Sequence, residues 1–152
     1  MEEYIPGGID QIHVVSLVYD KGGNVIARFT AKKLQEATGR GGLTLAAVSE
    51  EAPELEYLAE EAARALGRWC GPCSAKFKTG PTGGMPMLLS LKPRMNDCTA
   101  LAAACGVNLP QLLLDALVGK APRTAPKYQS GIAMVRYQAD IIRRKSDSLW
   151  KE

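Results

Sequence analysis

The clearest hydrophobic pattern lies near the N-terminus. Residues 12–19 are apolar except for His13 and Ser16, residues 20–24 form a Gly- and Asn-containing turn, and residues 25–30 are again mostly apolar. β-branched segments on either side of such a turn are typical of a β-hairpin. Both faces of the first segment are apolar, so we expect it inside a larger sheet or beneath a helix. Residues 43–48 are a third strand or only a lead-in to the next element.

Apolar residues spaced three and four apart predict helices in much of the remaining chain. The best example runs from about 50 to 66, where Leu55, Leu58, Ala62 and Leu66 form one stripe and Ser49 is the expected cap. Further helices are predicted at 31–37, 98–105, 109–118 and 128–148, and strand character at 85–91. The predicted fold class is therefore α+β: an N-terminal β-hairpin or small antiparallel sheet packed by four or five helices.

The chain has 152 residues, which fits a single domain, 1–152, with an ordinary core. Charge divides it unevenly. Residues 1–66, the acidic hairpin-plus-helix part, hold six Lys and Arg against eleven Asp and Glu, whereas residues 67–152 hold thirteen against five. Residues 67–97 form an irregular Gly/Pro-rich centre, and residues 98–152 a basic helical part. There is no run of ~18 apolar residues for a membrane span. The acidic N-terminus lacks the pattern of a signal peptide, which predicts a cytoplasmic protein.

The positive net charge of the second half, +8, predicts an anionic partner, either nucleic acid or an acidic protein surface, unless these charges are simply solvated. The leading hypothesis is a non-enzymatic accessory or binding protein that makes phosphate contacts. The residues expected to contact phosphate are Lys76, Lys78, Arg123, Lys127, Arg136, Arg143, Arg144 and Lys145. Two further cations, Lys92 and Arg94, also flank the Gly-rich centre.

Residues 100–117 resemble a helix-turn-helix, with Gly106 in the turn. The second helix is rich in leucine, and Gln111 is the single side chain suited to contact a base edge. This composition favours a packed helical hairpin. It also leaves open a structural subunit that joins a larger assembly through Leu112, Leu113 and Leu117.

The segment Trp69-Cys70-Gly71-Pro72-Cys73 is similar to the active-site pentapeptide of the thioredoxin family. The resemblance implies a dithiol at a helix N-terminus, in which Cys70 attacks a disulfide and Cys73 resolves it. It covers five residues, and the flanking sequence does not follow the family, so its fold is not implied. The alternative function is therefore a thiol-disulfide oxidoreductase or redox sensor.

The same thiols could form a zinc site with Cys98, Cys105 or His13. Cys98 and Cys105 lie seven residues apart on a predicted helix, a rise of ~10 Å, so at most one of them could join. A third interpretation has Cys98 and Cys105 as buried apolar residues and the other pair as a free dithiol. No metal and no cofactor is predicted, and residues 80–84 lack the spacing of a phosphate-binding P-loop.

Overall fold

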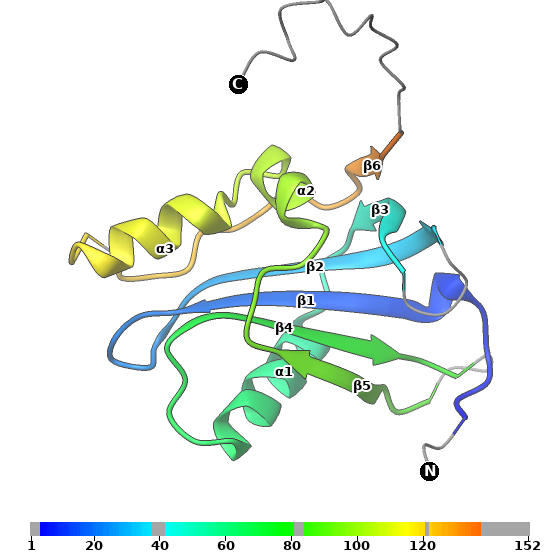
Figure 1. The fold of residues 1–152 in the computed structure, drawn as a ribbon, viewed down its shortest axis with the longest axis horizontal. Helices are drawn as coiled ribbons and strands as arrows, with labels where there is room; N and C mark the ends of the chain where they lie inside the picture. The colour runs from blue at the N-terminus through cyan, green and yellow to red at the C-terminus, as the bar shows by residue number, and fades with distance from the viewer. Residues whose placement is uncertain (1–3, 38–41, 81–83, 121, 138–152) are drawn as a thin grey trace, which may run out of the picture.

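The computed structural model describes residues 4–37, 42–80, 84–120 and 122–137. Its centre is one antiparallel six-stranded sheet in the order β5-β4-β1-β2-β3-β6 (Figure 1). The central strand, β1, is the first apolar segment of the chain, and β2 follows it as the second arm of a hairpin. The strands are β1 (Ile12–Tyr19), β2 (Val25–Glu36), β3 (Thr44–Ser49), β4 (Gly71–Lys78), β5 (Met87–Lys92) and β6 (Ala133–Val135).

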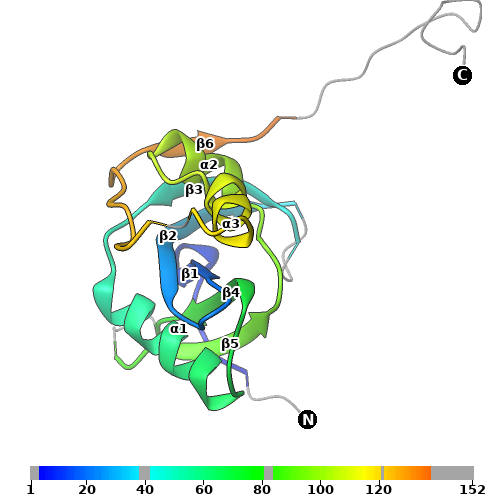
Figure 2. The ribbon, with the colours of Figure 1, turned by 90° about the vertical axis from the view of Figure 1, so that its left-hand side faces the viewer.

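Helices cover both faces of the sheet. Helix α1 (Pro53–Ala65) packs on one face, and α2 (Thr99–Ala104) and α3 (Leu109–Leu117) pack on the other (Figure 2). Because side chains alternate along a strand, β1 contributes to both cores. Leu17 packs with α1, and Val18 packs with α2 and α3. This double burial explains why nearly every position of β1 is apolar.

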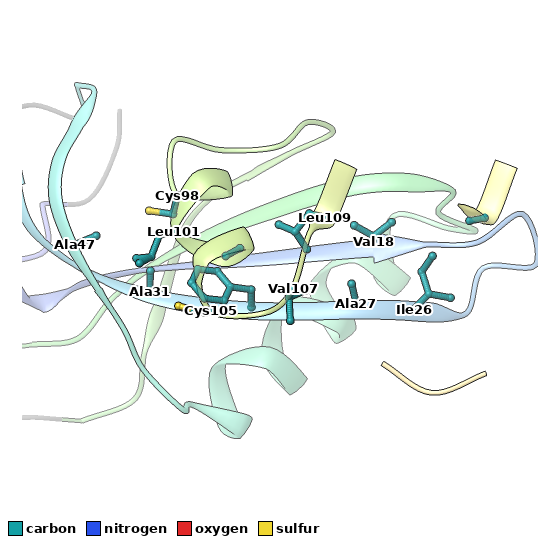
Figure 3. Close-up of a cluster of buried hydrophobic side chains, with 13 residues drawn as sticks. Val18, Ile26, Ala27, Ala31, Ala47, Cys98, Leu101, Cys105, Val107 and Leu109 are labelled. Carbon is teal, nitrogen blue, oxygen red and sulfur yellow. The ribbon is translucent and has the colours of Figure 1, made fainter. Parts of the chain in front are cut away.

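The core beneath α2 and α3 contains two of the four cysteines. Cys98 and Cys105 lie with Leu101 and Leu109 against Val18 and its neighbours in the sheet (Figure 3). Leu112 and Leu113 are partly buried against the same cluster. The prediction of a packed helical hairpin is therefore confirmed. Of the proposed assembly residues, Leu117 is half-exposed, at 50%, and its role in an assembly stays a prediction.

The predicted fold class is wrong in its balance of elements. The described residues contain six strands and three α-helices rather than a small sheet packed by four or five helices. Residues 31–36, predicted as a helix, instead extend β2, because their backbone pairs with β1 and β3. The centre at 67–97, predicted to be irregular apart from a strand at 85–91, also contains β4.

The last predicted helix is also corrected. Its described part is extended and adds β6 to the edge of β3, with Gly131 at a φ of +82°; residues 138–148 lie outside the described residues. Within the described ranges, no helix combines the length and apolarity needed to cross a bilayer.

Candidate anion-binding site

A polar pocket of about 50 Å³ lies on the α2/α3 face of the sheet, beside the segment that leads from β5 into α2. Five strands, β1 to β5, and this segment supply its walls. The polar or charged lining residues are Lys33, Thr44, Ser74, Lys76, Ser90, Lys92, Arg94, Asn96 and Asp97.

Strand register brings these side chains together. Lys76 of β4 pairs with Ser90 of β5, and Ser74 pairs with Lys92, which places two hydroxyl and ammonium pairs side by side. The register shifts by one residue next to Lys76 in the β4–β5 pair and next to Lys33 in the β2–β3 pair. Such β-bulges redirect side chains and are common beside functional sites.

The pocket carries an excess of positive charge. Lys33 is 2% exposed, and its Nζ lies 3.0 Å from Oε2 of Glu36, which neutralises it. The other three cationic side chains of the lining have no carboxylate partner among the described residues. Lys76 and Lys92 have no hydrogen-bond or ion-pair partner among the described residues, and Arg94 donates only to the carbonyl of Met95, at 3.2 Å. Burial lowers the pKa of Lys76, and the nearby charges of Lys33 and Lys92 lower it further.

The one carboxylate in the lining is already engaged. Asp97 Oδ2 accepts from the backbone N and the Oγ1 of Thr44, at 3.1 and 3.4 Å. Arg136 donates to the carbonyls of Thr44 and Asp97, at 2.8 and 2.9 Å, and Asn96 donates to Ser16 Oγ at 2.6 Å. These bonds fix the wall of the pocket. They leave Lys76, Lys92 and the two serine hydroxyls free to meet an oxyanion, which is held best by charged donors.

The pocket does not fit a divalent cation. Magnesium and calcium take oxygen ligands, chiefly carboxylates, whereas here one engaged carboxylate faces four cationic side chains. Elsewhere in the described part of the chain, no three His, Cys, Asp or Glu residues gather as a metal site. The zinc interpretation is wrong because the thiols lie apart: Cys98 and Cys105 are in the core beneath α2, whereas Cys73 packs against α1 on the other face of the sheet.

Of the five predicted phosphate-contacting residues that the structure describes, Lys76 alone lies in the pocket. Lys78 donates to the carbonyl of Ile5 at 2.8 Å, and Arg136 braces the pocket wall. Arg123 and Lys127 are exposed on the connector after α3. The remaining three, Arg143, Arg144 and Lys145, lie outside the described residues. Sequence reasoning missed Lys33, because a helix over 31–37 hides the alternation that puts it on the same face as Lys76.

The structure does not place the dithiol where the thioredoxin resemblance implies. Gly71, Pro72 and Cys73 begin strand β4 rather than a helix, so no helix dipole acts on the thiols. Cys73 is 1% exposed in the α1 core, and burial raises its pKa to about 11. Cys70 is exposed. The structure therefore lacks the helix N-terminus at the dithiol that the resemblance implies.

We expect one fast-reacting thiol in the native protein. Cys70 is exposed while Cys73, Cys98 and Cys105 are buried, and burial also raises the pKa of Cys98 to about 11. Titration with a chromogenic disulfide at mildly alkaline pH should label one thiol rapidly and the others only on unfolding. The Cys70→Ser variant should lose the fast phase, and rapid labelling of two thiols in the native protein would contradict this assignment.

Comparisons with known proteins support the architecture. No protein-family model matches the sequence, and no curated protein matches it either. Among solved structures, the fold is similar to the biotin carboxylase-beta-gamma-ATP complex from Campylobacter jejuni. The TM-score is 0.63 and the sequence identity 17%, and the match covers 81% of this chain and 28% of that chain. It is also similar to the phosphoribosylaminoimidazole carboxylase ATPase subunit from Aquifex aeolicus. Here the TM-score is 0.68 and the sequence identity 14%, and the match covers 93% of this chain and 44% of that chain. A third similar structure is the biotin carboxylase domain of Hydrogenobacter thermophilus 2-oxoglutarate carboxylase, in complex with MgADP, ADP and bicarbonate. Its TM-score is 0.57 and its sequence identity 17%, and the match covers 75% of this chain and 26% of that chain.

The fold of this chain is therefore similar to part of the fold of these carboxylase chains. The chain spans less than half of each of these three proteins. The finding corrects the leading hypothesis of a nucleic-acid-binding accessory protein, because the similar structures named above are carboxylase subunits and domains.

Proposed function

We propose that this domain binds the phosphate groups of an adenine nucleotide in the pocket lined by Lys33, Lys76, Lys92 and Arg94. The observation that carries the proposal is the convergence of Lys76 and Lys92, neither of which has a partner among the described residues. Two of the three similar structures named above are complexes with beta-gamma-ATP or with ADP, which favours a nucleotide over other anions.

The chemistry of the pocket suits phosphate. Ammonium groups act as point charges toward phosphate oxygens, and serine hydroxyls donate further hydrogen bonds. A pocket of about 50 Å³ takes a phosphate group rather than a whole nucleotide, so the base and sugar would lie outside it. The proposal concerns binding and assigns no reaction to the chain.

The residues also predict how the phosphate charge is neutralised. The lining offers lysines and an arginine and no free carboxylate pair for a metal. We therefore infer that the pocket binds ADP without a divalent cation, with the ammonium groups of Lys76 and Lys92 meeting the phosphate oxygens directly. Because these side chains are partly open to solvent, affinity should fall as salt rises.

The proposal is tested by calorimetric titration of the full chain with ADP in EDTA at low salt. Lys76→Ala should weaken binding about tenfold or more, since a hydrogen bond to a charged group contributes about 1.5–3 kcal/mol. Lys120→Ala is the matched control, because Lys120 is exposed and lies outside the pocket lining. Absence of ADP binding without magnesium, or equal affinity of Lys76→Ala and the unmodified protein, would overturn the proposal.

A further inference from the structure

A second pocket, of about 320 Å³, lies at the hairpin-turn end of the sheet. The turn between β1 and β2, the end of α1 and residues 67–69 enclose it. It shares no lining residue with the first pocket. Its chemistry comes from Tyr19, Arg28, Glu60, Arg64, Arg68 and Trp69.

Tyr19 supplies a buried polar atom without a partner. The residue is 6% exposed, and its hydroxyl has no hydrogen-bond partner among the described residues. Buried polar groups in folded proteins are nearly always paired, so an unpaired one calls for an explanation. Burial raises the pKa of Tyr19 to about 12, so at neutral pH the hydroxyl is protonated and can donate. The hydroxyl of Tyr19 can therefore donate a hydrogen bond to a ligand oxygen.

The charged side chains that line this pocket favour an acceptor that is an anion. Three guanidinium groups and one carboxylate line the pocket. Arg28 pairs with Glu60, whereas Arg64 pairs with Glu61, which does not line the pocket. Arg68 donates to the carbonyl of Lys21, at 2.7 Å. A guanidinium carries five N–H donors, so Arg64 and Arg68 keep donors for a ligand.

The walls of this pocket are held in place by the backbone. The indole Nε1 of Trp69 donates to the carbonyl of Pro72 at 3.2 Å, which fixes the ring. Gly23 has a φ of +83°, and a Cβ there would lie 3.4 Å from Cγ of Arg68. That distance is ordinary van der Waals contact, so glycine is favoured here by the left-handed backbone conformation of the turn. The pocket is shaped before any ligand arrives.

We propose that this second pocket binds a small oxyanion, a carboxylate or a phosphate, whose oxygen accepts from the hydroxyl of Tyr19 and whose charge is met by Arg64 and Arg68. The proposal is independent of nucleotide binding at the first pocket. The first pocket and this second pocket share no lining residue, so both can be occupied at the same time.

The test uses the full chain and two probes, inorganic phosphate and succinate, which separate phosphate from carboxylate recognition. Binding is followed through the indole N–H resonance of Trp69, identified by its persistence in a Trp150→Phe variant. At least one probe should shift this resonance saturably at millimolar concentration. Tyr19→Phe removes one oxygen that has no partner, so the fold should survive, and affinity should fall about tenfold.

Tyr57→Phe is the matched control, because Tyr57 is 62% exposed on α1, and it should bind as the unmodified protein does. Arg68→Gln should also weaken binding, and it serves if Tyr19→Phe fails to fold. Lys76→Ala should leave this site unchanged, so failure here is distinguishable from failure of nucleotide binding. The proposal would be overturned if a folded Tyr19→Phe or Arg68→Gln variant bound the probe as tightly as the unmodified protein. It would also be overturned if neither probe shifted the indole resonance of Trp69.

Discussion

Replacing Phe29 with alanine is expected to lower the free energy of unfolding by about 3–5 kcal/mol. Phe29 is fully buried at 0% exposure, in the core between the sheet and α2 and α3. Its ring also meets Tyr128 edge to face, with centroids 5.0 Å apart. The substitution removes apolar contacts, leaves a cavity and deletes the aromatic pair, and each loss acts in the same direction.

The second ring makes this position sensitive. The hydroxyl of Tyr128 lies within hydrogen-bond distance of Glu56 Oε1, at 2.7 Å, and of the carbonyl of Glu50, at 2.8 Å. Phe29 therefore supports the contact between the connector after α3 and the start of α1. Urea unfolding followed by circular dichroism measures the loss. Tyr57→Ala, at an exposed ring, should change stability by no more than about 0.5 kcal/mol, and a comparably small effect of Phe29→Ala would contradict the assigned core.

Local signals explain what the sequence predicts well. The β1–β2 hairpin is specified by a β-branched run and the turn at 20–24, and both are complete within about twenty residues. The packed pair α2 and α3 is likewise specified locally: Asn108 accepts from the backbone N of Gln111 as a cap, and Pro110 lies in the first turn. These elements form where short-range and long-range preferences agree.

The errors arise where sheet pairing overrides local preference. Residues 31–36 contain Ala, Lys, Gln and Glu, which favour helices, yet they are held in β2 by neighbours on both sides. Ser49, expected to cap α1, is buried in β3, and its Oγ accepts from the backbone N of Ile132. That partner lies 83 residues away. No local pattern reveals such a contact.

The candidate site is least visible in the sequence because its cations come from different strands. Lys33, Lys76 and Lys92 belong to β2, β4 and β5, and strand order and two bulges bring them together. The division of the chain into an acidic and a basic part hides this, since Lys33 comes from the acidic part. Counting charge along the chain therefore finds the positive excess but not the place where it acts.

Neutralising Glu36 is expected to have opposite effects on stability and on ADP affinity. Lys33 and Glu36 form a buried pair, with side chains 2% and 6% exposed. Glu36→Gln leaves the ammonium of Lys33 buried without its counter-charge, which should lower the free energy of unfolding by about 3–5 kcal/mol. A double replacement, Lys33→Met with Glu36→Gln, removes the charge itself and should cost less than Glu36→Gln alone.

The same change adds one uncompensated positive charge to the pocket that holds Lys76 and Lys92. If that pocket takes phosphate, Glu36→Gln should bind ADP more tightly than the unmodified protein, under conditions where both are folded. The double variant should bind no more tightly than the unmodified protein, because it lacks the charge of Lys33. Urea unfolding and ADP titration of the three proteins give both quantities. A Glu36→Gln variant that loses stability and affinity together would show that the pair shapes the pocket without setting its charge.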